Sequence, residues 1–206
     1  NKAITALTID PVNPTTIFAS TQGGGVFRST NAGGSWSTIN SGLTNKNVTA
    51  LSIDPTTPTT FYASTQGGGV FKSTTGGGNW TSANNGLPRF GVNALAIDPV
   101  TPTTLYVGRS SFDGEGGIYK STNAGGNWTV MSNGLPTFAS VAAVVIDPLA
   151  TNTLYAAISN FGVFKSIDAG ASWTITATTG LDLDILTLAI DPQTPDTLYA
   201  GTDGEG

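Results

Sequence analysis

The stretch Ser-Thr-Asn-Ala-Gly-Gly-Ser-Trp at 29–36 decides the fold, because closely similar octets recur at 73–80, 121–128 and 166–173. An Ile-Asp-Pro precedes every octet, and a fifth Ile-Asp-Pro follows the last one. The aspartates of these tripeptides are 44, 44, 49 and 44 residues apart; they are Asp10, Asp54, Asp98, Asp147 and Asp191. A fixed period of this size is typical of a solenoid, a propeller or another repeat array. The chain is therefore one supersecondary unit written four times and begun a fifth time.

The third unit carries an insertion. The interval from the aspartate to the tryptophan of the octet is 26 residues in units one, two and four, but 30 residues in unit three. The extra residues lie around 109–115 (Arg-Ser-Ser-Phe-Asp-Gly-Glu), between the runs that are expected to form the second and third strands of this unit.

Each unit is predicted to form four short strands separated by turn residues, and the second unit shows the pattern best. The expected strands there are 48–53, 60–64, 69–73 and 80–83, bounded by Asp-Pro and glycine-rich turns. No stretch has helical periodicity over three turns. The connections are too short for crossover helices, so each unit must be an antiparallel meander. The sequence predicts an all-β chain.

The first strand of each unit favours a β-propeller of four-stranded antiparallel blades. Its larger residues, such as Leu51 and Ile53, alternate with small ones, such as Ala50 and Ser52, and both faces are nearly free of charge. Such a strand suits sheets stacked face to face, with the bulky side of one blade entering the small side of the next. A parallel β-helix is the alternative, but it usually has shorter rungs and no four-strand meander.

We expect a single repeat domain over 1–206 with about four and a half blades. The predicted blades span 3–43, 47–87, 92–135 and 141–180, with a partial blade at 185–206. Because the fifth unit supplies only its first two strands, sheet faces and edges would be exposed in isolation. We therefore expect these residues to belong to a larger propeller, or to an assembly in which further copies of the chain complete the ring.

Composition excludes several functional classes. The net charge of −5 argues against nucleic acid or an anionic membrane surface as a partner, and no apolar stretch approaches the ~20 residues needed for insertion through a bilayer. Without cysteine and histidine there is no thiolate metal site, no imidazole base and no nucleophile activated by histidine. We expect neither a metal nor a cofactor. A surface rich in Thr, Ser, Asn and Gly, and poor in Lys and Glu, favours a secreted protein.

The octets resemble the Asp-box, or bacterial neuraminidase repeat (BNR), whose pattern is Ser-x-Asp-x-Gly-x-x-Trp, and the likeness covers essentially the whole chain. The unit is similar to those of Asp-box propellers, which include sialidases, xyloglucan-degrading glycoside hydrolases, the sortilin ectodomain, photosystem II assembly factors and uncharacterised secreted bacterial proteins. The resemblance implies a β-propeller. It does not select a function, because the motif is shared by unrelated activities.

The octet residues are expected to be structural. Serine and Asp or Asn side chains bond turn amides, glycine takes the positive φ of the hairpin, and tryptophan fills the apolar space between the third and fourth strands. Three of the four octets lack a carboxylate at the third position, so metal binding or acid catalysis there is disfavoured. The predicted structural residues are Ser29, Asn31, Gly33, Trp36, Ser73, Thr75, Gly77, Trp80, Ser121, Asn123, Gly125, Trp128, Ser166, Asp168, Gly170 and Trp173.

Two other recurrent sets are also interpreted as scaffold. The Ile-Asp-Pro aspartates are expected to accept local amide hydrogen bonds in their turns. Basic residues recur on the third strand and are expected to be solvated or paired with neighbouring blades, with a functional basic stripe as the alternative; they are Arg28, Lys72, Lys120 and Lys165.

Specific binding is expected where the repeat is broken, on one rim of the propeller. Successive turns of a meander alternate between two rims, so the second-to-third turns and the links between blades share one of them, here called the loop rim. Loops on a rigid scaffold are where binding residues usually lie. The alternative is that its phenylalanines fold back over the blade ends as covers. The candidate binding residues on the loop rim are Arg89, Phe90, Arg109, Phe112, Asp113, Glu115, Phe138, Asp182 and Asp184.

Two functions remain open. The favoured one is a non-catalytic secreted module that binds a protein or glycan partner or builds an extracellular scaffold. The alternative is a fragment of a xyloglucanase-like glycoside hydrolase, which would need two carboxyls about 5 Å or about 6.5–9.5 Å apart. The acids available for such a pair are Asp113, Glu115, Asp182 and Asp184, apart from Asp203 and Glu205. A sialidase is disfavoured, because that resemblance requires an arginine triad, and only Arg89 and Arg109 lie near the loop rim.

Overall fold

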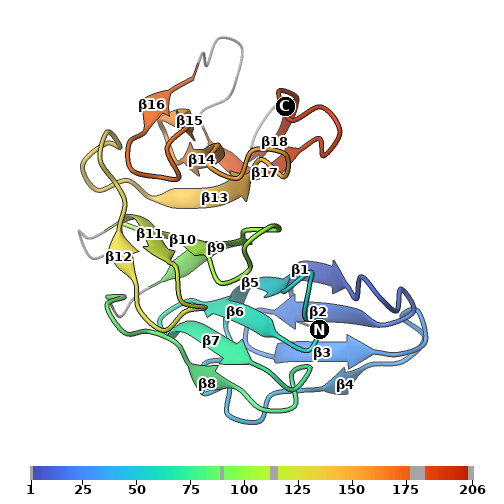
Figure 1. Ribbon diagram of the computed structural model, residues 1–206. Helices are drawn as coiled ribbons and strands as arrows, with labels where there is room; N and C mark the ends of the chain where they lie inside the picture. The colour runs from blue at the N-terminus through green and yellow to red at the C-terminus, as the bar shows by residue number, and fades with distance from the viewer. Residues whose placement is uncertain (1, 89–90, 112–115, 177–183, 204–206) are drawn as a thin grey trace.

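The computed structural model describes residues 2–88, 91–111, 116–176 and 184–203, and these ranges contain eighteen β-strands and no helix. Figure 1 shows the strands as small sheets that follow one another along an arc from the N-terminus to the C-terminus. In the described ranges, no helix is long and apolar enough to cross a membrane.

The strands occupy four positions in each repeat unit. The first strands are β1 (Ile4–Ile9), β5 (Val48–Ile53), β9 (Val92–Ile97), β13 (Val141–Ile146) and β17 (Ile185–Ile190). The second strands are β2 (Ile17–Thr21), β6 (Phe61–Thr65), β10 (Leu105–Arg109), β14 (Leu154–Ile158) and β18 (Leu198–Thr202). The third strands are β3 (Gly25–Ser29), β7 (Gly69–Ser73), β11 (Gly117–Ser121) and β15 (Gly162–Ser166). The fourth strands have two residues each and are β4 (Ser37–Thr38), β8 (Thr81–Ser82), β12 (Thr129–Val130) and β16 (Thr174–Ile175).

The sheets have the topology that the sequence predicts. Strands β1 to β4 form one antiparallel sheet in sequence order, and the next three sets of four strands do the same. Strands β17 and β18 form a two-stranded sheet. We call the complete sheets blades 1 to 4 and the last one half-blade 5. The prediction of an all-β propeller with four-stranded antiparallel blades is confirmed.

The first strands lie on the inner side of the arc, where those of successive blades contact one another. Each carries a β-bulge near its start, which leaves one residue unpaired with the second strand. In blades 1 and 2 the bulged residue is threonine: Thr5 Oγ1 donates a hydrogen bond to Val48 O at 2.7 Å, and Thr49 Oγ1 donates to Val92 O. A bulge bends a strand and aims its side chain away from the ladder. Here it aims a hydroxyl at the neighbouring blade.

The apolar core lies between the blades rather than inside them. Phe18 of blade 1 meets Phe61 of blade 2 edge to face, with ring centres 4.6 Å apart, and both belong to one cluster with Leu51 and Trp80. Equivalent clusters lie between blades 2 and 3 and between blades 3 and 4. Each sheet is therefore stabilised mainly by burial against its neighbours.

Candidate functional site

The octet side chains are engaged inside their own turns. In blade 3 the Ser121 hydroxyl accepts a hydrogen bond from Gly125 N at 3.0 Å and donates one to Asn123 Oδ1 at 2.9 Å. Asn123 Oδ1 also accepts from Asn127 N at 2.8 Å. These bonds satisfy turn amides that have no partner in the strand ladder. The octet thus closes the turn between the third and fourth strands and presents no reactive group.

Blade 4 has a carboxylate at the third octet position. Asp168 accepts hydrogen bonds from Ser172 N at 2.9 Å, from Ser172 Oγ at 2.6 Å and from Ser166 Oγ at 2.8 Å. The two bonds from Ser172, followed by that from Ser166, lower the pKa of Asp168 to about 2. This carboxylate is held ionised, so it is unsuited to act as a general acid.

We expect the Asp168 carboxyl to titrate near pH 2. Because its folded pKa lies below the ordinary value of 3.8, the carboxylate stabilises the fold above that value, and the contribution is lost as the pH falls through about 2. Asp168→Asn, which copies the asparagine of blades 1 and 3, should keep the neutral-pH stability nearly unchanged and remove this acid dependence. NMR titration of the carboxyl carbon and urea denaturation across the acid range measure both effects. A carboxyl that titrates near 4 would contradict the assignment.

The octet tryptophan links two blades. Trp80 is only 2% exposed, and its indole Nε1 donates to Ile39 O of blade 1 at 2.7 Å. The tryptophans of the next two octets bond carbonyls of the blades before them in the same way, at 2.8 Å. The prediction that tryptophan fills space between strands of its own blade is wrong: it lies in the joint with the preceding blade, because that is where an open apolar face is available. Trp36, with no blade before it in the described chain, is 42% exposed.

The same joints contain a second contact, made by the recurrent lysines. Tyr62 OH and Lys72 Nζ of blade 2 both donate to Ala124 O of the blade 3 octet, each at 3.2 Å. In blade 3, Tyr106 OH and Lys120 Nζ reach Ala169 O at 3.0 and 3.1 Å. Burial, followed by the charge of a nearby aspartate, raises the pKa of both tyrosines to about 12, so they remain hydrogen-bond donors. The lysines therefore pair with neighbouring blades.

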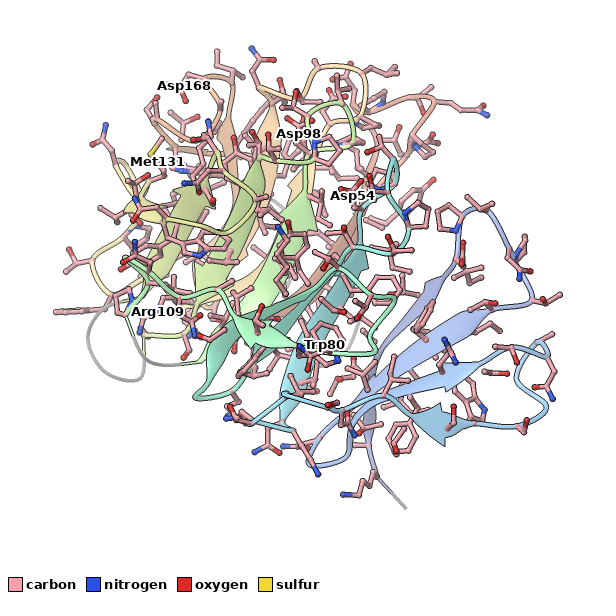
Figure 2. All side chains as sticks on the ribbon, turned by 60° about the horizontal axis from the view of Figure 1, so that its bottom comes forward. Asp54, Trp80, Asp98, Arg109, Met131 and Asp168 are labelled. Carbon is pink, nitrogen blue, oxygen red and sulfur yellow. The ribbon has the colours of Figure 1, made fainter. Side chains whose placement is uncertain are left out.

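The Ile-Asp-Pro aspartates are turn caps on the rim opposite the loop rim. Asp54 Oδ1 accepts hydrogen bonds from Thr56 N at 2.8 Å and from Thr57 N at 2.9 Å, and the other four aspartates accept the equivalent pair. Figure 2 shows Asp54 and Asp98 at the end of the blades away from Arg109. Carboxylates engaged in this way hold turns and are not free for catalysis.

The links and the second-to-third turns lie together, as the alternation of rims requires. Ser110 N bonds Gly91 O at 3.0 Å, and Ser159 N bonds Ser140 O at 2.9 Å. Each pair joins a turn to the link that precedes its own blade. Six of the nine candidate residues on this rim fall outside the described residues; they are Arg89, Phe90, Phe112, Asp113, Glu115 and Asp182.

Arg109 is not an exposed rim side chain, which corrects the sequence-based expectation. It is the last residue of β10 and has no exposed surface. Its guanidinium lies 5.7 Å from the centre of the Tyr119 ring, at a distance typical of a cation–π contact. The repeat comparison places Arg109 beside an insertion, but it cannot show that β10 continues through this residue and buries it. Arg109 is therefore part of the packing of blade 3.

Phe138 is an exposed aromatic residue held in an unusual conformation. It lies in the link before blade 4, its side chain is 63% exposed, and its φ is 61°. Ala139 N bonds Pro136 O at 3.1 Å and closes the turn around it. A bulky residue at positive φ is uncommon and often marks a functional position. An exposed fraction this large favours a binding role for Phe138 over the alternative role as a cover of the blade end.

A second exposed aromatic residue on this rim was not predicted. Phe161 lies in the turn between β14 and β15, is 45% exposed, and follows Asn160 with φ 65°. The signal was available, because the corresponding turns of blades 1 and 2 have only glycine at these two positions. A glycine turn replaced by Asn-Phe is a break in the repeat. The loop rim of blade 4 thus carries two exposed phenylalanines.

Two exposed acidic residues lie opposite each other at one end of half-blade 5. Asp184 directly precedes β17 and Asp203 directly follows β18, and Asp203 N donates to Asp184 O at 3.0 Å. Residues directly opposite in an antiparallel pair place their Cβ atoms about 4.5–5.5 Å apart. In the part of the chain that the structure describes, no group of three or more acidic side chains could hold a metal ion.

The cavity on the loop rim of blade 2 does not offer a better site. It has a volume of about 380 Å³ and is lined by residues that include Gly67, Gly68 and Asn84. The Asn84 side chain is already used, because Nδ2 donates to Gly68 O at 2.9 Å and Oδ1 accepts from Val70 N at 2.6 Å. A binding pocket needs converging polar groups that remain available to a ligand.

Comparisons with known proteins concern the fold. No model of a protein family matches the chain, and no curated protein matches it. Among solved structures, an ancestral GH74 enzyme is similar with a TM-score of 0.79 and 24% identity over 96% of this chain and 27% of the enzyme. The GH74 xyloglucanase from Xanthomonas campestris has a TM-score of 0.71 and 19% identity, covering 90% and 31%. YCF48 from Cyanidioschyzon merolae has a TM-score of 0.59 and 17% identity, covering 92% and 60%.

The chain thus spans about a quarter to a third of the length of the two GH74 structures. Identities below 25% support a shared fold and not a shared activity. The chain has a β-propeller fold, with four-stranded blades like those of the GH74 structures.

Proposed function

We propose that the chain is a secreted, glycan-binding segment of an Asp-box propeller, and that it binds a neutral β-glucan such as xyloglucan on the loop rim without chemistry of its own. The observation that carries the proposal is Phe138, which is 63% exposed in a turn where its own φ is positive. Phe161 places a second ring on the same rim of blade 4. A polymeric glycan is an extracellular ligand, which is why we also propose secretion.

Exposed phenylalanine rings suit this ligand class. A pyranose ring offers an apolar C–H face that packs on an aromatic surface, and exposed apolar patches with polar surroundings usually mark binding sites. The chain has few charged side chains and a net charge of −5, which disfavours polyanions but not a neutral polymer. The GH74 xyloglucanase among the similar folds supports xyloglucan as the first glycan to test.

Hydrolysis is the second candidate function, and one observation favours it. Asp184 and Asp203 are exposed acids opposite each other at the loop rim of half-blade 5. Glycosidases use two carboxyls across the scissile bond, and retaining enzymes hold them about 5–5.5 Å apart. This pair is therefore the place to test for turnover.

Replacing either Phe138 or Phe161 by alanine is expected to weaken binding to xyloglucan by roughly tenfold, the loss typical of an aromatic anchor worth about 1–2 kcal/mol. Affinity electrophoresis in gels that contain xyloglucan measures the change. Leu149→Ala is the matched control, because Leu149 belongs to the same blade and is 71% exposed but lies on the opposite rim. Binding should be unchanged in that variant.

The same protein samples separate the two candidate functions. Equal binding by Phe138→Ala, Phe161→Ala and Leu149→Ala, or no binding by the unmodified chain, would refute the glycan-binding proposal. Release of new reducing ends from xyloglucan that disappears in Asp184→Asn would assign hydrolysis instead.

A further inference from the structure

The joints between blades 2 and 3 and between blades 3 and 4 share one set of contacts. The earlier blade supplies a socket: a lysine–tyrosine pair that donates to a carbonyl, and a carbonyl after the fourth strand that accepts an indole N–H. The octet of the next blade fills it with the carbonyl of its alanine at positive φ and with its tryptophan. The socket therefore specifies its occupant chemically.

Blade 4 presents the same socket, and in the described residues no octet fills it. Lys165 Nζ lies 5.1 Å from the centre of the Tyr155 ring, as Lys120 Nζ lies 5.3 Å from that of Tyr106 in the filled joint. Thr176 follows β16 at the position whose carbonyl accepts the indole in the other joints, where it is Ile39, Ala83 or Met131.

An open cavity of about 510 Å³ lies at this socket. Tyr155, Lys165 and Thr176 line it together with the apolar side chains of Val163, Leu188, Leu198 and Ala200 and with Asp196. The volume exceeds that of an indole ring, and the walls are largely apolar, as in the joints that tryptophan fills. The cavity thus combines apolar walls with the three polar groups that an octet would bond: Lys165 Nζ, Tyr155 OH and Thr176 O.

The edge of half-blade 5 next to this cavity is also open. Within the described ranges β18 pairs only with β17, so its outer backbone groups are free to pair with another strand. The corresponding strands β6, β10 and β14 are buried over their full length, whereas Tyr199 and Ala200 in β18 are exposed.

We propose that this cavity and the outer edge of β18 form a docking site for a β-hairpin that carries a tryptophan octet. The hairpin adds as third and fourth strands, with its serine opposite Leu198 and its first glycine opposite Thr202, the register that β14 and β15 have in blade 4. Its alanine carbonyl accepts from Lys165 and Tyr155, and its indole donates to Thr176 O. The backbone hydrogen bonds of the added strand supply affinity, and the cavity that receives the indole ring supplies specificity.

The electrostatics of the socket agree with this occupant. A hydrogen bond with the Tyr155 hydroxyl is the main cause that raises the pKa of Lys165, and the charges of Asp196 and Asp147 add to it against the opposing effect of partial burial. The lysine is therefore cationic and held beside Tyr155, where it can donate to a backbone carbonyl.

A second copy of the chain is a poorer occupant than a free hairpin. The octet of its blade 1 has an exposed tryptophan, Trp36, but the hairpin of β3 and β4 is paired with β2 in its own sheet. That hairpin would have to leave its sheet in order to dock. A free hairpin pays only for the ordering of its own backbone.

A labelled synthetic peptide with the sequence of 25–39, whose octet has alanine at the required position, tests the proposal directly. Titrated against the full chain and followed by fluorescence anisotropy, it is expected to bind saturably at one site. The peptide with Trp36→Ala should bind at least tenfold more weakly, and Lys165→Ala in the protein should weaken binding by about fivefold or more. Lys120→Ala is the matched control, because its acceptor carbonyl is already in place, and it should leave peptide affinity unchanged.

A second measurement covers a peptide that is too weakly ordered to bind in trans. Fusing 26–39 directly after Gly206 makes docking intramolecular and should raise the Tm relative to the same fusion with Trp36→Ala. Equal binding by the two peptides would overturn the proposal, as would no saturable binding together with equal Tm values. Self-association of the chain that the peptide does not displace would assign the face to a second copy and also overturn it.

Discussion

Replacing Trp128 by alanine is expected to lower the free energy of unfolding by about 3–5 kcal/mol, the range for large buried aromatic side chains. The indole is 2% exposed and belongs to the cluster between blades 2 and 3. Its Nε1 also donates to Ala83 O at 2.8 Å, so the change leaves a cavity and a half-buried carbonyl without its donor. Urea denaturation monitored by circular dichroism measures the loss. Because the indole lies between blades 2 and 3, both blades should be destabilised.

Trp36→Ala is the matched control for this prediction. Trp36 holds the same octet position but is 42% exposed, because no described blade precedes blade 1. Its replacement should change the free energy of unfolding by less than about 1 kcal/mol. If the two variants were equally destabilised, the tryptophan would act inside its own blade, as the sequence suggested, and the joint would not be the main source of stability.

The joints make the propeller a chain of nearest-neighbour interactions. Blades 1 and 2 and blades 2 and 3 are also connected along the inner strands by threonine hydroxyls, Thr5 to Val48 O and Thr49 to Val92 O. The corresponding positions in blade 4 and half-blade 5 are Ala142 and Leu186, which cannot make such a bond. Stability in such arrays is approximately a sum over units and interfaces. Loss of one joint is therefore expected to loosen the blades on both sides of it.

The fold could be predicted because its signals are local and recur in phase. The strand predicted at 48–53 is β5 with the same bounds, and the one at 69–73 is β7. The fourth strand is shorter than the predicted 80–83, because Trp80 turns towards the preceding blade and leaves only Thr81 and Ser82 in the ladder. Turn residues and the alternation of large and small residues along a strand are both visible within a few positions, so a single sequence is sufficient to recognise them.

The contacts between blades could not be predicted in the same way. The indole of Trp80 bonds a carbonyl 41 residues earlier, and that of Trp128 one 45 residues earlier. A repeat comparison identifies residues that recur, but it does not distinguish contacts within a unit from contacts with the next one. Both arrangements would produce the same periodic sequence.

The loop rim shows the complementary difficulty. Phe138 was predicted from its position in a variable link, and the structure places it on the surface. Arg109 was predicted by the same argument, yet it is buried, because an insertion in the sequence does not show where the preceding strand ends. Phe161 was missed because it replaces a glycine without changing the length of the turn. When binding residues are predicted from breaks in a repeat, a substitution in a turn of constant length should therefore be considered as well as an insertion.

Gly134→Ala is the second substitution expected to have a large effect, with a loss of at least about 3 kcal/mol or a failure to fold. A Cβ atom built on Gly134 would overlap the carbonyl oxygen of Trp173, and the residue has φ 89°. The backbone of the octet cannot retreat easily, because Trp173 N is bonded to Asn133 O at 2.9 Å and its indole to Met131 O at 2.8 Å. Thermal and urea denaturation measure the effect.

Gly76→Ala separates this clash from the general strain of alanine at positive φ. Gly76 has φ 63° and no atom within 4 Å of a built Cβ, and alanine already occupies the equivalent octet position in the other three units, as Ala32, Ala124 and Ala169. The cost of the left-handed conformation, about 1 kcal/mol, is offset by about 0.4–1 kcal/mol from the less flexible unfolded chain. We therefore expect the Tm of Gly76→Ala to stay close to that of the unmodified chain. If Gly134→Ala were equally mild, the backbones of Gly134 and Trp173 would be farther apart than the structure places them. The close contact between the octet of blade 4 and blade 3 would then not be needed for stability.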